Sequence, residues 1–249
     1  MNIADNKHIL VQRGWKHYNS TKNEEVHFVD DPDANAFMND LEDNPHAYVL
    51  ACVMDRQIKA ERAWMIPAKV KDIIGGGSIE NFARVSRADY ITMFTENSFH
   101  RFNETMADAF YHAVHRISDV YNGDAAKIWS GEPSSAAVVY RFMQFKGVGI
   151  KIATMATNIL ARDFKIQFSD YYSIDVSTDT HIRRVMRRIG LVPENGDNDM
   201  IRYKARELCP EFPGIIDYPL WEIGREWCHS RNPECSKCVV KEVCEKYNL

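Results

Sequence analysis

Apolar residues recur at three- and four-residue intervals along most of the chain, which is the spacing of one face of an α-helix. We predict helices over residues 33–43, 46–72, 103–121, 136–144, 150–162, 181–190, 199–208 and 216–228, with a short helix beginning at Ser78. Residues 163–178 lack this spacing and are expected to be irregular. No stretch forms a convincing ladder of alternating strand positions. The pattern therefore predicts an all-α fold.

Length and composition narrow the class of protein. The 249 residues are 45% hydrophobic and 27% charged, which suffices for one or two packed domains. No apolar run approaches the roughly 18 residues of a membrane span, and the start of the chain lacks the basic-then-apolar order of a secretory signal. We therefore expect a cytoplasmic protein, nucleoid-associated in a prokaryote, with no membrane partner. The net charge of −4 argues against a globally basic coat protein but permits a local basic face.

The cysteines are unevenly spread. Cys52 and Cys209 stand alone, whereas a 17-residue segment holds the other four in the pattern C-x6-C-x2-C-x5-C, at Cys228, Cys235, Cys238 and Cys244. In a reducing compartment such a group indicates a metal site rather than disulfides. Zinc sites usually present two close pairs separated by a longer loop. A single compact loop favours an iron–sulfur cluster, with zinc as the alternative.

Two glycines and a lysine stand between two predicted helices. Gly147-Val148-Gly149 permits a tight turn that leaves backbone amides bare at the next helix start, where they can bind a phosphate. An ordinary helix–helix turn is the alternative. Lys151 follows, and a partly desolvated amine at a helix start favours its neutral, nucleophilic form. A surface lysine without such a role is the other interpretation.

Further along the chain, Asp179-Thr180-His181 begins a basic helix. The Asp179 carboxylate could stabilise a developing cation or direct a proton, or it could simply cap the helix. Four arginines of this helix lie on one side of it, at residues 183, 184, 187 and 188. Such a stripe suits phosphates, and a solvated helix face is the alternative.

The cysteine loop, the G-V-G-x-K hairpin and the D-T-H-I segment together resemble the endonuclease III branch of the helix-hairpin-helix DNA glycosylases. The resemblance runs from about Asn44 to the C-terminus, in the family's order, and includes Gly224-Arg225-x-x-Cys228. It implies a two-lobed helical fold. Residues 1–43 would be a helical extension packing on the cluster lobe, 44–162 a lobe ending in the helix-hairpin-helix motif, and 163–249 the lobe with the catalytic aspartate and the cluster loop.

The resemblance also implies a role for each residue that matches a family motif. Lys151 matches the Schiff-base lysine and Asp179 the essential aspartate. The 4Fe–4S ligands would be Cys228, Cys235, Cys238 and Cys244. Gly147 and Gly149 would hold a DNA phosphate, with a monovalent cation at the hairpin. Gln57 would fill the gap left by an extruded nucleotide.

One further position, Phe102, falls near the family's intercalating wedge, and a core aromatic is the alternative there. With the arginine stripe, the expected DNA-binding residues are Gln57, Phe102, Gly147, Gly149, His181, Arg184 and Arg187. Around the wedge, His100-Arg101-Phe102 departs from the family pattern, and residues 164–172 are an insertion. These departures surround the base pocket and leave the excised base open.

The implied activity is base excision repair by a monomeric DNA glycosylase with abasic-site (AP) lyase activity. It would act on double-stranded DNA that contains a damaged or mismatched base or an abasic site. The base is flipped out, Lys151 attacks C1′ of the sugar, and β-elimination from the imine nicks the strand. The alternatives are a monofunctional glycosylase for mismatched thymine, uracil or a modified base, a non-catalytic DNA-binding relative, and a zinc-bearing interaction module.

Overall fold

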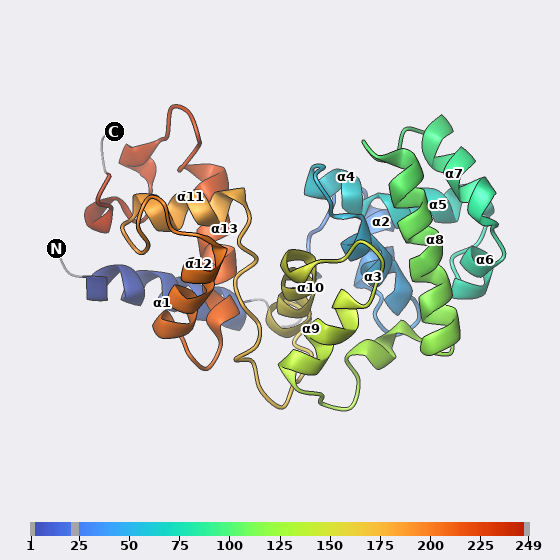
Figure 1. The fold of residues 1–249 in the computed structure, drawn as a ribbon, viewed down its shortest axis with the longest axis horizontal. Coiled ribbons are helices and arrows are strands. Elements are labelled where there is room, and N and C mark those ends of the chain that lie inside the picture. Colours follow the sequence, from blue (N-terminus) through green and yellow to red (C-terminus); the bar gives the residue numbers. More distant parts are fainter. Residues whose placement is uncertain (1–2, 21–24, 247–249) are drawn as a thin grey trace. The chain divides into compact units, whose positions relative to one another are not determined.

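The computed structural model describes residues 3–20 and 25–246, and these residues form thirteen α-helices, four short 3₁₀ helices and no strand (Figure 1). The predicted all-α fold is confirmed. Within the described residues no helix combines the length and the apolar character that crossing a membrane requires.

The chain divides into two compact units. The hairpin unit comprises residues 23–133 and 140–156, and the cysteine unit comprises residues 1–22, 134–139 and 157–249. Helices α9 (Ser135–Met143) and α10 (Ile150–Arg162) contribute residues to both units. The domain boundaries expected after residues 43 and 162 stay a prediction.

The hairpin unit is built around one buried helix, α3. Its other elements are α2 (Pro32–Asn39), α4 (Ala60–Trp64), α5 (Ile66–Ile74), α6 (Ile79–Ala83), α7 (Arg87–Glu96), α8 (Asn103–Val120) and η1 (Ala125–Ile128). Every residue of α3 (Pro45–Met54) is buried, and the helix packs against α2, α4, α5, α8 and η1. The Tyr48 hydroxyl donates to the Ala156 carbonyl at 2.7 Å, which satisfies the polar atom of a buried ring.

The single helix predicted over residues 46–72 is wrong, because the structure has α3, α4 and α5 there. The apolar spacing continues through the whole stretch, but two local features interrupt it. Helix α3 ends at Met54, where Asp55 leaves the helical conformation, and Gln57 adopts a left-handed φ of 56° in the loop before α4. Pro67 lacks an amide hydrogen and is accommodated at the start of α5 rather than in a helix interior.

Two helices were not predicted from their apolar spacing: α1 (Ile3–Ser20), which the resemblance implied only as part of a helical extension, and α7. The start of α7 carries a readable signal, because Ser86 and Asp89 form a reciprocal cap. The Ser86 Oγ accepts from the Asp89 amide at 3.1 Å and donates to the Asp89 carboxylate at 2.7 Å.

In the cysteine unit, helices surround an irregular segment. The elements are α1, α11 (Thr180–Arg188), α12 (Asn198–Leu208), η2 (Pro213–Ile216), α13 (Asp217–Glu226), η3 (Cys235–Lys237) and η4 (Lys241–Val243). Residues 163–178 contain no helix, as predicted. Helices α11 and α13 approach closely at Gly224, where a Cβ atom would lie 2.6 Å from the Cβ of His181. Only glycine permits this contact.

A buried ion pair attaches α1 to the rest of the cysteine unit. Arg162 donates twice to the Asp163 carboxylate, at 3.0 and 2.7 Å, and His17 Nε2 lies 3.1 Å from the same group. The His17 ring stacks on Tyr218 of α13 with centroids 3.8 Å apart. Burial raises the pKa of the Asp163 carboxyl, but Arg162 and His17 outweigh that effect and lower its pKa to about 2.

We expect Asp163→Asn to lower the free energy of unfolding by about 3–5 kcal/mol, because Arg162 would remain buried without its counter-charge. Urea denaturation measures the loss. The matched control is Asp199→Asn, which removes an exposed carboxylate 2.7 Å from Arg202 and should cost less than about 1 kcal/mol. Equal losses in the two variants would contradict a special role for the buried pair.

The same pair predicts a dependence of stability on pH. The pKa of Asp163 is lower in the folded state than the roughly 3.9 of an unfolded aspartate, so its stabilisation is fully present above pH 4. That stabilisation, about 2 kcal/mol, should be lost as the pH falls from 4 to 2. Asp217 acts in the opposite direction, because burial raises its pKa. The advantage of the wild type over Asp163→Asn should therefore shrink by about 2 kcal/mol when denaturation is repeated across this range.

Candidate functional site

The predicted hairpin joins α9 to α10. Gly147 has a φ of 85°, a conformation that L side chains rarely adopt, and Val148 beside it is buried. No atom lies within 4 Å of the position that a Cβ on Gly149 would take, so this side of the turn is open. The Arg56 guanidinium lies 3.9 Å from the Cβ position of Gly147. The turn therefore offers an open backbone with a cation beside it, as a phosphate site requires.

Lys151, in the first turn of α10, is partly buried and ion-paired. Its side chain is 40% exposed, and its Nζ donates to Oδ2 of Asp55 at 2.8 Å. The Asp55 side chain is only 9% exposed, and the Asp55 backbone amide caps the C-terminus of α3 by donating to the Cys52 carbonyl. Lys151 is thus not an ordinary surface lysine. Sequence reasoning missed Asp55, whose one local signal is a carboxylate directly after the apolar α3.

A second buried carboxylate lies beside the hairpin. Asp108 of α8 accepts from Arg87 Nε at 2.5 Å and pairs with Lys146, the residue before Gly147. His112 Nε2 lies 3.5 Å away. Burial raises the pKa of Asp108, but hydrogen bonds from Lys146 and Arg87 lower it overall. This group anchors the hairpin to α8 and was also missed from the sequence.

The two residues expected to enter DNA lie on exposed segments of the hairpin unit. Gln57 is exposed in the loop between α3 and α4. Phe102, directly before α8, is 37% exposed, with the Arg101 guanidinium 4.8 Å above its ring. The core-aromatic alternative is therefore wrong, while the wedge role stays a prediction. His100 beneath it is buried, and burial lowers its pKa and keeps the ring neutral.

In the cysteine unit, Asp179 caps α11. Its Oδ1 accepts from the Ile182 amide at 2.8 Å, so the capping interpretation is confirmed and any catalytic role would be additional. The preceding residue, Thr178, has a strained φ of 45°. Ser177 donates its amide to the buried Asp217 carboxylate at 2.5 Å, which fixes the segment that presents Asp179.

The arginine stripe of α11 contacts the protein itself. Arg184 donates to the carbonyls of Cys228 and Gly224 at 2.6 and 2.7 Å and lies 3.0 Å from Nδ1 of His181. Arg187 donates to the carbonyl of Gly196 at 2.6 Å. These contacts hold neighbouring loops in place. Phosphate binding by His181, Arg184 and Arg187 stays a prediction.

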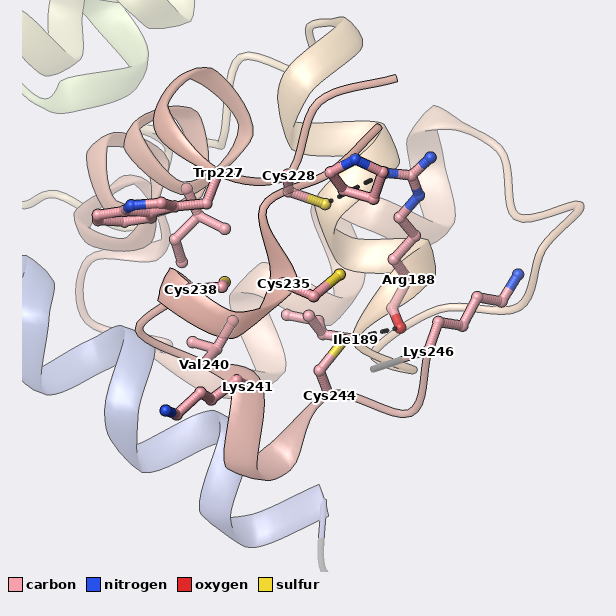
Figure 2. A pocket seen from close by; sticks show the side chains of 12 residues that line it. Arg188, Ile189, Trp227, Cys228, Cys235, Cys238, Val240, Lys241, Cys244 and Lys246 are labelled. Atoms are coloured by element: carbon pink, nitrogen blue, oxygen red, sulfur yellow. Dashed lines mark hydrogen bonds between the residues drawn. The ribbon is translucent and has the colours of Figure 1, made fainter. Parts of the chain in front are cut away.

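The four clustered cysteines are free thiols that line one cavity of about 150 Å³ (Figure 2). Its walls include Ile189, Ile223, Trp227 and Val240, with Arg188, Lys241 and Lys246 as cations. Arg188 donates to the Cys228 sulfur at 3.5 Å, and Cys244 donates to the Arg188 carbonyl at 3.6 Å. No three His, Cys, Asp or Glu residues of the described chain are arranged to hold a metal ion. A thiol-lined cavity of this size with cationic walls fits a group larger than one ion, held by thiolates.

The other two cysteines lie away from this cavity. Cys52 is buried within α3, and Cys209 is buried just after α12. Burial raises the pKa of both thiols, to about 11 for Cys209. Both therefore resemble inert core residues rather than ligands or nucleophiles.

Comparison with known proteins gives sequence matches over part of the chain and fold matches over nearly all of it. No family model matches. The endonuclease III of Sulfolobus acidocaldarius is 31% identical over 105 residues, covering 41% of this chain and 42% of that protein. The match thus spans less than half the length of this curated relative.

Two solved structures share the fold. One is a trapped covalent endonuclease III–DNA intermediate, with a TM-score of 0.65, 16% identity and coverage of 99% of this chain and 97% of that one. The other is a thermostable thymine-DNA glycosylase, with a TM-score of 0.65, 14% identity and 99% coverage of both chains. The chain is therefore similar to endonuclease III in sequence over part of its length, and it shares the fold of endonuclease III and of a thymine-DNA glycosylase over nearly all of it.

Proposed function

We propose that this protein is a base-excision-repair DNA glycosylase with associated AP lyase activity. It acts as a monomer on double-stranded DNA that contains a damaged or mismatched base or an abasic site. The observation that carries the proposal is the Lys151 amine, held in the first turn of α10 directly after the open Gly147-Val148-Gly149 turn. A nucleophile next to a phosphate site is the arrangement that attack on a sugar of the DNA backbone needs.

The hairpin supplies the DNA contact. Backbone amides at the start of α10 bind a phosphate, with Arg56 beside the turn and a monovalent cation at its carbonyls. Gln57 and Phe102, both exposed, stabilise the duplex once the target nucleotide has left the stack. A phosphate contact made by backbone amides agrees with a protein whose overall charge is negative and whose basic groups are local.

The chemistry then follows from the residue types. The Lys151 amine adds to C1′ of the deoxyribose, and the base departs with the electrons of its glycosidic bond. The Asp179 carboxylate stabilises the positive charge that develops on the sugar. The nitrogen pair then forms a C1′=N double bond as the ring C1′–O4′ bond breaks and O4′ takes the proton that the amine released. The resulting imine acidifies the C2′ proton, and loss of that proton expels the 3′ phosphate. A relative that used water instead of Lys151 would release the base without nicking the strand.

The cavity of the cysteine unit is proposed to hold a 4Fe–4S cluster on Cys228, Cys235, Cys238 and Cys244. When bound, such a cluster supplies folding free energy to the loop that carries its ligands. Arg184 and Arg188 already contact the carbonyls of this loop, so α11 and the ligands together fix its position.

Borohydride reduction should trap a covalent complex between the wild-type protein and a duplex that contains one abasic site. Lys151→Gln should abolish the trap, because it removes the amine proposed as the nucleophile, while DNA affinity should remain. Lys69→Gln, which removes an exposed lysine of the same unit, is the matched control. Gel analysis of the trapped species against a panel of single-lesion duplexes also identifies the excised base.

Undiminished trapping by Lys151→Gln would assign the nucleophile to another amine, with Lys146 the first to examine. Base release by the wild type without any trapping would instead identify a monofunctional glycosylase. Neither base release nor trapping, with DNA binding intact, would identify a non-catalytic relative.

Protein purified without oxygen should be brown and contain iron and sulfide in the ratio of one 4Fe–4S cluster per chain. Cys238→Ser should lose iron, because it removes one of the four thiols that line the cavity. Cys209→Ser, away from the cavity, is the control and should retain it. Metal analysis that finds one zinc and no iron in the wild type would refute the cluster.

A further inference from the structure

The contact between Lys151 and Asp55 has a geometry that an incidental surface ion pair lacks. Asp55 follows a helix whose every residue is buried, and its amide donates to the Cys52 carbonyl at 3.1 Å, so its backbone is fixed. Its carboxylate is almost withdrawn from solvent. Within the described residues, Lys151 is the one basic group whose nitrogen lies within 4.0 Å of it. The lysine proposed as nucleophile thus has a dedicated carboxylate at hydrogen-bond distance.

Protonated lysine cannot attack carbon, because its nitrogen has no free electron pair. A general base within about 2.6–3.2 Å of the proton-bearing atom can remove that proton, and the 2.8 Å distance lies in this range. The other titratable or charged groups around the contact do not compete for this role. Cys52 is a buried thiol whose pKa is raised, His100 is held neutral, and Arg56 bears a permanent charge.

We propose that Asp55 is a further catalytic residue, the acid–base partner of Lys151 in imine formation. The inference rests on the proposed lyase function. The Asp55 carboxylate takes one proton from the Lys151 ammonium, and the freed nitrogen pair forms a bond to C1′ of the open abasic aldehyde. The carbonyl electron pair moves to oxygen, which takes a second proton from the nitrogen. The Asp55 carboxyl then returns its proton to this hydroxyl group, which leaves as water while the C1′–N double bond forms.

Over these reaction steps, one ammonium ion and one aldehyde are converted to one iminium ion and one water, and Asp55 is regenerated as a carboxylate. The positive charge begins on Nζ and ends on Nζ. A buried carboxylate beside that atom therefore has a cationic partner both before and after the reaction, which avoids an unpaired buried charge. Gln57, the polar residue expected from the sequence to act near this loop, is exposed and has no contact of this kind with Lys151.

A purely electrostatic counter-ion would give the opposite experimental result. Such a carboxylate would hold the amine in its unreactive ammonium form, and its removal would make Lys151 react faster near neutral pH. The direction of the rate change in an isosteric variant therefore separates the two roles.

The test is single-turnover borohydride trapping on a duplex with a preformed abasic site, measured from pH 6 to pH 10. We expect Asp55→Asn to trap about 100-fold more slowly than the wild type near pH 7. The difference should shrink as the pH rises, because hydroxide then removes the proton that Asp55 normally accepts. Asp72→Asn removes an exposed carboxylate from α5 of the same unit and should match the wild type at every pH. Asp55→Glu should recover part of the lost rate.

An unchanged or faster rate for Asp55→Asn would overturn the proposal. A loss that is equal at every pH and is not recovered in Asp55→Glu would also overturn it, because it would reduce Asp55 to a structural residue. Thermal unfolding and DNA affinity of each variant show whether folding contributes. Absence of trapping in the wild type refutes the lyase chemistry itself, and that outcome is distinct from a failure confined to the Asp55 variants.

Discussion

The placement of Lys151 depends on the complete burial of α3. Because all ten residues of this helix are buried, the residue that follows it also lies below the surface, and that residue is Asp55. A carboxylate removed from water is costly unless a cation meets it. Lys151 supplies the cation from the first turn of α10. The Lys151 amine, proposed as the nucleophile, is therefore held by a residue at the end of the buried helix α3, and the exposed glycine turn precedes the helix that carries it.

The loop that carries the four cysteines follows a different principle. Val240 is the one buried hydrophobic residue among the described residues 228–246, so apolar packing gives this loop little stability. Charge-assisted hydrogen bonds from Arg184 and Arg188 to its carbonyls supply part of the stability that apolar packing does not give. A group bound by four thiolates would supply the rest. On this account two arginines of the α11 stripe, Arg184 and Arg188, stabilise this loop through its carbonyls.

The sequence predicts those helices whose apolar residues recur at regular local spacing. The helix expected at residues 103–121 corresponds to α8, whose buried stripe includes Phe110, Val114 and Ile117. Helix α1 was not predicted from its spacing because it is attached less by an apolar stripe than by His17, which contacts the buried Arg162–Asp163 pair. The same distinction applies to the candidate site. A glycine turn followed by a lysine can be recognised from neighbouring residues. Asp55, the partner of Lys151, lies 96 residues away in the sequence and could not be recognised in this way.

The two residues that match the family's catalytic pair both lie at helix starts, where the helix dipole is positive. Asp179 is stabilised there, and it caps α11 in the usual way. Lys151 is not, because a cation at the start of α10 is opposed by the dipole and by the bare amides of the hairpin. Asp55 compensates for that opposition through one short hydrogen bond. The Lys151 amine therefore lies between bare backbone amides, which disfavour a cation, and a carboxylate at a distance suited to proton transfer. A lysine at this position without such a carboxylate would have the first and lack the second.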